Sequence, residues 1–224
     1  MVGVIPMGPS VPPAAHQLLT YWFGQPSPAR VEPAIIERWQ NLGALHVAGW
    51  RADREADLAL GRRFAPWLEQ AAQGLRPAWC ATARGRLAYV VLCDQLPRAA
   101  YRGTAKAYAY DPLALAVTRE GLARGDEFSL SAVEGAFLCM PLVHAEDLAA
   151  QDAACERFAA LGSAAPELRP ILGIFQESAI RHRRLIRCFG RFPNRNVALG
   201  RVSTLEEQRY LASPWTYFEK DEVS

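Results

Sequence analysis

The sequence contains few of the residues on which metal centres and disulfide frameworks depend. Its 224 residues include only four histidines and five cysteines, and no HExxH, ExxH or CxxC spacing brings them together. Zinc and di-iron centres need several ligands at such spacings, and a disulfide framework needs cysteines in pairs. Cys93 and Cys139 lie in apolar helical runs that are typical of core thiols. We therefore expect no metal and no cofactor, and a reducing cytoplasm.

Long apolar runs and nucleotide-binding loops are also missing. The longest apolar stretches, such as LAYVVLC and AFLCMPLV, are far shorter than the roughly 18 residues of a membrane-spanning helix. The N-terminal MVGVIPMGPSVPP lacks the basic region of a signal peptide and is interrupted by proline. The motifs GxSxG, GxGxxG and GxxxxGKS/T do not occur, which removes the common hydrolase and nucleotide-binding signatures. The sequence predicts a soluble, cytoplasmic protein that does not bind a membrane.

Lysine is almost missing as well. Of 25 basic residues only Lys106 and Lys220 are lysines, and the formal net charge is +2. So small a charge creates no overall field that would attract nucleic acid, and we expect no nucleic-acid partner. The excess of arginine has two interpretations. It reflects a GC-rich genome, or it reflects arginines buried against carboxylates, where lysine fits poorly.

Hydrophobic residues, by contrast, make up half of the chain, which is enough for one substantial core at this length. Apolar residues recur at helical spacing, and no strand alternation or NG or DG hairpin turn is present. We predict an all-α, single-domain fold with antiparallel helix pairs in a TPR-like array, although the TPR repeat of roughly 34 residues is not visible. The helical domain is expected over 14–212, between an extended or disordered arm at 1–13 and a tail at 213–224.

Capping residues, prolines and glycines set the expected helix ends. Helices are predicted at 14–23, 33–50, 53–74, 83–96, 112–124, 145–161 and 171–189. The cap patterns are Asp111 before Pro112, Ser131 with Glu134, and Ser203 or Thr204 with Glu206 or Glu207. Pro66 is expected to split its helix, and Pro141 to kink or break the one that starts after Ser131. Gly162 and Gly190 are expected to end theirs.

Three of these helices turn an apolar face toward an ionisable residue. Asp94, His144 and His182 each take the next position on a stripe of apolar side chains. Because a buried charge is costly unless it is paired, the stripes predict an internal polar cluster. The arginines expected to meet it are Arg98, Arg102, Arg191 and Arg195. A structural interpretation stands beside this one, in which the histidines are hydrogen-bonded core residues and Asp94 braces a neighbouring arginine.

The segment FGRFPNRN, residues 189–196, lies in a stretch from Ser178 to Leu205 that holds seven arginines and no Asp or Glu. This positive charge beside a proline turn indicates either a site for an anion or an internal brace neutralised by acids from elsewhere. Asp94, Glu146 and Asp147 are the acids expected to come to the turn from other segments.

Four segments resemble the signature blocks of a bacterial family known as domain of unknown function 924. They are LLTYWFG (18–24), CDQLPRAAYRGTAKAYAYD (93–111), FLCMPLVHAEDLAAQ (137–151) and HRRLIRCFGRFPNRNVALGRVSTLEEQRYL (182–211). The resemblance covers about residues 18–212 and implies a TPR-like, right-handed array of helix pairs, without an established activity. The matched positions are Asp94, Gln95, Arg98, Arg102, Gly103, Thr104, His144, Glu146, Asp147, Arg191, Arg195 and Asn196. Two residues depart from the family pattern: Leu96 stands where Phe is frequent, and Asn194 stands where His is usual.

Three functions are compatible with these observations. The favoured one is a pocket for a small anionic molecule or a peptide terminus, in which arginine forks hold a carboxylate or phosphate. Its ligand-binding residues are Arg98, Arg102, Glu146, Arg191, Asn194, Arg195 and Asn196. The second is a metal-independent enzyme with His144, Asp94 or Asp147 as general acid or base. The third is a helical scaffold for a protein partner or a second copy of the chain, in which Arg191 and Arg195 are fully paired with Asp94, Glu146 or Asp147.

Overall fold

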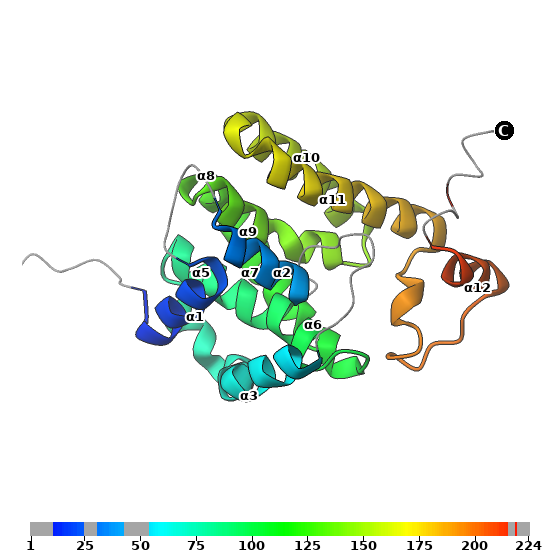
Figure 1. Ribbon diagram of the computed structural model, residues 1–224, viewed down its shortest axis with the longest axis horizontal. Coiled ribbons are helices and arrows are strands. Elements are labelled where there is room, and N and C mark those ends of the chain that lie inside the picture. Colours follow the sequence, from blue (N-terminus) through cyan, green and yellow to red (C-terminus); the bar gives the residue numbers. More distant parts are fainter. Residues whose placement is uncertain (1–10, 25–30, 43–53, 215–217, 219–224) are drawn as a thin grey trace, which may run out of the picture.

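The computed structural model describes residues 11–24, 31–42, 54–214 and 218, and within these ranges the chain is helical and has no β-strand (Figure 1). The helices are α1 (Pro13–Phe23), α2 (Pro33–Asn41), α3 (Arg54–Gln70), α4 (Arg76–Trp79), α5 (Ala83–Val90), α6 (Leu96–Ala100), α7 (Asp111–Leu122), α8 (Asp126–Ser129), α9 (Ala132–His144), α10 (Leu148–Ala164), α11 (Arg169–Phe189) and α12 (Leu205–Ala212). The predicted all-α fold is confirmed. No described helix is long and apolar enough to cross a membrane.

Local sequence signals account for several helix ends. Ser131 and Thr204 each form a capping box with the glutamate three residues later, and these boxes begin α9 and α12. Gly190 adopts a left-handed conformation, φ 68°, directly after α11, where a side chain would be strained. These expected boundaries are confirmed. The arm and tail lie largely outside the described residues, so the domain limits stay a prediction.

Other boundaries differ from those expected. Helix α3 runs through Pro66, which is exposed, and the chain bends at Gly74 instead, where φ is 118°. Helix α9 likewise continues past Pro141 to His144. A proline inside a helix costs about 3 kcal/mol, and the burial of every residue from Val133 to Val143 outweighs this cost. Helix α10 passes Gly162 and ends at Ala164.

Two further predictions need correction. Helix α2 ends at Asn41, short of the expected 50, and residues 43–53 lie outside the described part of the chain. Asp111 is not the N-cap of α7, since Tyr110 takes that position and Asp111 is the first helical residue. The Asp111 carboxylate is therefore turned to other partners, which are described below.

Pairs of contacts at equal sequence separation show that three helical segments run parallel to one another. Arg84 and Asp94 pair with Glu134 and His144, at the same sequence separation of 50 residues, so the α5–α6 segment runs parallel to α9. Phe137 with Phe175 and His144 with His182 show the same for α9 and α11. Helix α10 lies between α9 and α11 in the sequence, and it packs against both of them. We retain the TPR-like array as a prediction for this arrangement.

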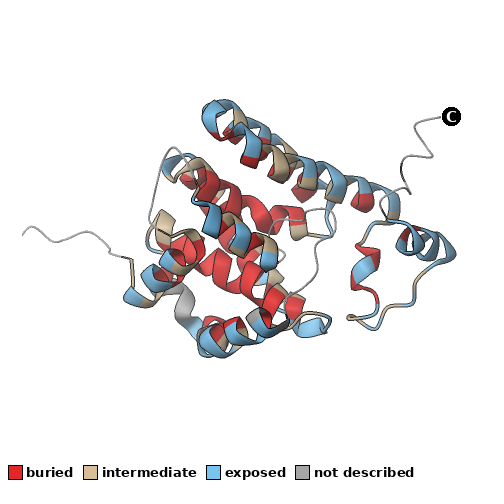
Figure 2. Cartoon of the chain, viewed as in Figure 1, coloured by how far each residue is buried: buried red, intermediate tan, exposed pale blue. Residues whose placement is uncertain are grey.

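Phe137 lies at the centre of the core. Its ring contacts Trp39 at 4.7 Å, Phe175 at 5.2 Å and Phe23 at 5.3 Å between centroids. Buried residues follow α5, α7 and α9 through the middle of the molecule, whereas α10 and α11 expose their outer faces (Figure 2). A separate small cluster, made of Leu185, Ile186, Phe192 and Tyr210, joins the end of α11 to α12.

Candidate functional site

Asp94 lies in a π-helical turn, Val91–Gln95, between α5 and α6. Pro97, two residues after the end of this turn, has no N–H to donate to the carbonyl of Cys93, which favours a wider turn at this point. Such turns are frequent at functional sites because they displace one side chain from the regular helix face. Here the displaced region includes Asp94, whose side chain is fully buried.

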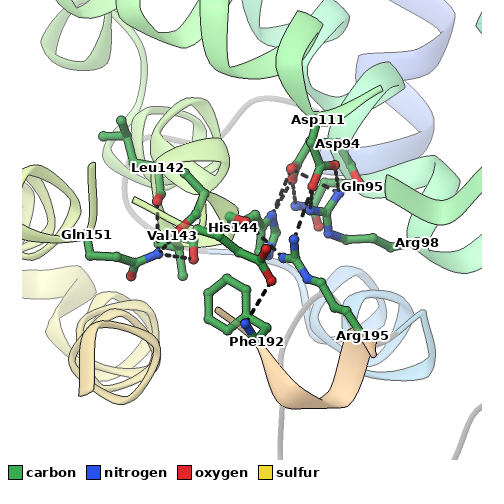
Figure 3. Close-up of polar contacts among 12 residues, drawn as sticks. Asp94, Gln95, Arg98, Asp111, Leu142, Val143, His144, Gln151, Phe192 and Arg195 are labelled. Carbon is green, nitrogen blue, oxygen red and sulfur yellow. Dashed lines mark hydrogen bonds and ion pairs between the residues drawn. The ribbon is translucent and has the colours of Figure 1, made fainter. Parts of the chain in front are cut away.

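Three side chains contact this buried carboxylate, and Arg98 is the one that carries a positive charge (Figure 3). An Nη1 of Arg98, one turn further on, lies 3.1 Å from Oδ1 of Asp94, and Gln95 donates from its amide to Oδ2. The Nδ1 atom of His144 lies 2.8 and 3.0 Å from the two carboxylate oxygens. Burial by itself raises the pKa of Asp94, but the charge of Arg98 and the contacts with His144 outweigh it and lower the pKa to about 2. Asp94 is therefore ionised at neutral pH.

The His144 imidazole is neutral at the same pH. Burial and the positive charge of Arg98 lower its pKa, and the opposing effect of Asp94 does not restore it. A neutral ring that contacts a carboxylate through Nδ1 carries its proton on Nδ1 and keeps a lone pair on Nε2. Nε2 has no hydrogen-bond partner among the described residues, and it does not belong to the buried polar atoms that lack one. It is available to a ligand as an acceptor or a base.

Two arginines share one carboxylate next to this dyad. Arg98 binds both oxygens of Asp111, with both N–O distances at 2.8 Å. Arg195 reaches Asp111 at only 3.5 Å and donates to the carbonyl of His144 at 2.9 Å. Its guanidinium also lies over the rings of Phe192 and Tyr108, at 4.5 and 4.7 Å from their centroids. Burial and then the charge of Arg98 lower the pKa of Arg195 to about 10.

Gln151 fixes the end of the helix that carries His144. Its side chain is buried and comes from α10, and its amide nitrogen lies 3.2, 2.7 and 2.7 Å from the carbonyls of Leu142, Val143 and Ala145. These carbonyls belong to the last turn of α9 and the residue after it, where intrahelical donors run out. Gln151 therefore orients the backbone on either side of His144 (Figure 3).

The FGRFPNRN turn is held by an ion-pair brace. Glu207 of α12 binds Arg191 through both oxygens at 2.6 and 2.8 Å, and Asn196 donates to the same carboxylate at 3.2 Å. Glu146 accepts the N–H of Phe192 at 2.8 Å and pairs with Arg201. We call these five side chains and this N–H the brace. Because the brace fixes Phe192 and Asn196, it also positions Arg195 between them.

The cluster opens into a cavity, which we call the polar pocket. Its volume is about 170 Å³, and Arg98, Arg102, His144, His182, Asn194 and Arg195 line it together with Gln95, Tyr108, Met140 and Ser178. Arg102 at its rim pairs with the buried Asp57 through both carboxylate oxygens, at 2.7 and 3.0 Å. The pocket is thus lined both by His144, whose Nε2 has no partner among the described residues, and by three guanidinium groups.

The structure brings together some of the predicted site residues and separates others. Arg98, Arg102, His144, Asn194 and Arg195 line the polar pocket, and Asp94 lies behind it in contact with Arg98 and His144. Arg191, Glu146 and Asn196 belong to the brace. Asp147 caps α10 by accepting from the N–H of Ala150, is half-exposed, and faces Arg119 at 3.6 Å rather than the cluster. Arg191 and Arg195 have other carboxylate partners than those expected, namely Glu207 and Asp111.

Three residues of the site were not predicted from the sequence. Asp111 was assigned to a helix cap, and neither Gln151 nor Tyr108 was given a role in the site. The acid of a DP pair at a helix start is an ambiguous signal, since a cap and a long-range ion pair use the same residue type. The predicted core thiols fit the structure, because Cys93 and Cys139 are buried, and burial raises the pKa of both thiols.

Fold and site together define an all-α protein with a buried aspartate–histidine dyad beside an arginine-lined pocket. The chain belongs to the family described as bacterial protein of unknown function (DUF924), whose sequence profile matches residues 18–215. It is similar to a solved structure, the protein of unknown function ATU0120 from Agrobacterium tumefaciens, with 32% sequence identity and a TM-score of 0.69. That match covers 88% of this chain and 96% of the other. No curated protein matches the chain.

Proposed function

We propose that the polar pocket binds a small anionic molecule, a carboxylate or a phosphate, and that Arg98 and Arg195 hold its charge. The observation that carries this proposal is the sharing of Asp111 between the two arginines. Arg98 takes both oxygens at close range and leaves Arg195 with a contact of 3.5 Å. A guanidinium has five N–H donors, and two of those on Arg195 have partners among the described residues.

The charges around Arg195 support the same proposal. Its lowered pKa means that its positive charge is disfavoured where it lies, because it is buried and close to Arg98. A bound anion relieves both costs, since it supplies the opposite charge and charge-assisted hydrogen bonds. The exposed amide of Asn194 at the pocket wall supplies a further donor.

Calorimetric titration with inorganic phosphate and with acetate tests this proposal. We expect binding to the wild-type protein and a loss of at least about tenfold in affinity for Arg195→Gln, equivalent to about 1.4 kcal/mol. Arg209→Gln is the matched control, because Arg209 is strongly exposed and lies outside the pocket, so its affinity should equal that of the wild type. Equal affinities for all three proteins would show that the anion binds elsewhere.

A second candidate function is metal-independent acid–base catalysis on the bound anion. The geometry of the Asp94–His144 dyad favours it: Asp94 holds the Nδ1 proton, which leaves Nε2 at the pocket as a base. The ionised Asp94 also stabilises the imidazolium that forms when Nε2 takes a proton. Substrate screening on anionic metabolites should yield a turnover that His144→Gln abolishes while the circular dichroism spectrum is retained. Turnover that survives this substitution would exclude His144 as the base.

A further inference from the structure

A second cavity, of about 240 Å³, adjoins the polar pocket. Residues of α11, of the turn around 192–195 and Tyr210 of α12 line it. Ser178, His182, Asn194 and Arg195 line both cavities. A ligand held at Arg195 therefore has a continuous wall of side chains along which it can extend.

The character of the second cavity differs from that of the polar pocket. Its apolar lining comes from Ile174, Leu185, Phe192, Tyr210 and Pro214, and Glu177 and Arg181 of α11 add polar groups to those shared with the polar pocket. Three of these apolar residues belong to the small cluster that is separate from the main core. A cavity of about 150 Å³ with apolar walls is enough to hold a benzene ring. We call this second cavity the apolar pocket.

His182 stands at the junction. Its ring centroid lies 6.2 Å from that of His144 and 5.3 Å from that of Phe192, so it contacts the dyad on one side and the apolar pocket on the other. The Nδ1–H of His182 donates to the carbonyl of Ser178 at 2.7 Å, which fixes the ring in this position. Ligand atoms that pass from one cavity to the other lie against His182 and Asn194.

From this continuity we infer that the ligand is amphipathic: a carboxylate or phosphate bound at Arg98 and Arg195, carrying one aromatic or branched aliphatic group that occupies the apolar pocket. The inference rests on the anion binding proposed above and adds the chemical class of the molecule. A small polar anion such as acetate or phosphate fills only the polar pocket. An aryl carboxylate fills both and removes apolar surface from water on the ligand and on the protein.

The test compares acetate, 3-phenylpropanoate and the neutral 3-phenylpropanol by isothermal titration calorimetry. We expect 3-phenylpropanoate to bind at least about tenfold tighter than acetate, and the alcohol to bind at least about tenfold more weakly than the acid. Ile174→Trp should fill the apolar pocket and lower the ratio of the phenylpropanoate affinity to the acetate affinity toward one. Ile174 is suitable because it lines the apolar pocket but not the polar pocket. Ile180→Trp, the same change at an exposed site on the same helix, should leave the ratio as it is in the wild type.

The outcomes separate the two proposals. If acetate and phosphate bind but 3-phenylpropanoate binds no tighter, the inference fails and anion binding stands. If no carboxylate or phosphate binds, both fail. If Ile174→Trp does not fold, nuclear Overhauser contacts between the phenyl protons of the probe and the Phe192 or Tyr210 ring decide the matter in the wild-type protein. Contacts support the apolar pocket, and a bound probe without them overturns it.

Discussion

The imidazole of His144 is held between one carboxylate and two guanidinium groups. Asp94 contacts its Nδ1, Arg98 lies beyond that carboxylate, and Arg195 donates to the backbone carbonyl of the same histidine. Burial and then the charge of Arg98 disfavour the protonated ring and lower its pKa, Asp94 favours it, and Arg195 adds to the effect of Arg98. The consequence is a neutral base whose orientation is fixed, a state suited to accept a proton from a ligand.

This balance predicts that His144 titrates below 6.5, the ordinary histidine pKa. The unfolded chain then takes up the proton at higher pH than the folded protein does. The contribution of His144 to the free energy of unfolding is therefore complete above the unfolded pKa and is lost as the pH falls through the folded pKa. A ring NMR titration gives the folded value directly. Denaturant unfolding should show that the free energy of unfolding falls less between about pH 7.5 and pH 5 in His144→Gln than in the wild type. A folded pKa at or above 6.5 would contradict the prediction.

Gln151 offers a second prediction at the residue scale. Gln151→Met keeps the apolar contacts of the side chain but removes the donor to three carbonyls around His144. We expect a loss of about 2 kcal/mol in the free energy of unfolding, since buried carbonyls lose their partner. The affinity for phosphate should fall as well, because the carbonyl that Arg195 binds belongs to His144. Gln208→Met is the control, since Gln208 is exposed and donates to one carbonyl. Similar losses in both variants would remove the special role of Gln151.

At the scale of elements, the turn from Arg191 to Arg201 depends on its partners in α12 and after α9. The turn has one short 3₁₀ element, Pro193–Arg195, and few apolar contacts, so the brace contributes much of its order. Hydrogen bonds from Arg191, then from Thr204 and Asn196, lower the pKa of Glu207 to about 2. The stability that Glu207 contributes is thus present above its unfolded pKa and is lost as the pH falls toward 2.

The brace yields a prediction with a neighbouring control. Glu207→Gln removes the charge that holds Arg191, and we expect a loss of about 2 kcal/mol in the free energy of unfolding at neutral pH. Glu206→Gln changes the adjacent residue, which is 60% exposed and lies 4.0 Å from Arg209, and should cost less than about 0.5 kcal/mol. Unfolding by urea measures both. Equal effects in the two variants would mean that the brace does not stabilise the turn.

The same elements show which part of the site a sequence can predict. A position on a helix face follows from local spacing, so Asp94, His144 and His182 were expected on buried stripes. The structure buries Asp94 fully and the two histidines in part. The pairing of charges depends on how distant helices pack, and spacing carries no information about it. Asp111, 84 residues from Arg195, therefore took the place that was expected for Asp147. The continuation of α9 through Pro141 has the same cause, since tertiary packing outweighs a local rule.

At the scale of the whole molecule, the site spans two hydrophobic clusters of unequal size. Asp94 and His144 come from helical segments that contribute to the main core. Arg195 comes from the turn next to the small cluster of Leu185, Ile186, Phe192 and Tyr210. The polar pocket is complete only when the two clusters are packed together. We therefore expect the proposed anion binding to be linked to the docking of the C-terminal segment.

This linkage predicts a difference in hydrogen exchange along the chain. Few buried side chains hold residues 191–212, so this segment should open without unfolding of the core and should exchange faster than residues 133–143 of α9. Phosphate at a saturating concentration should slow exchange in 191–212 and leave 133–143 unchanged, because it binds only when Arg195 is docked. Peptide-resolved mass spectrometry measures both segments in one experiment. Arg195→Gln should remove the effect of phosphate and keep the difference between the segments. Equal exchange in the two segments without ligand would mean that the clusters unfold as one unit, and the pocket would then be preformed rather than assembled by docking.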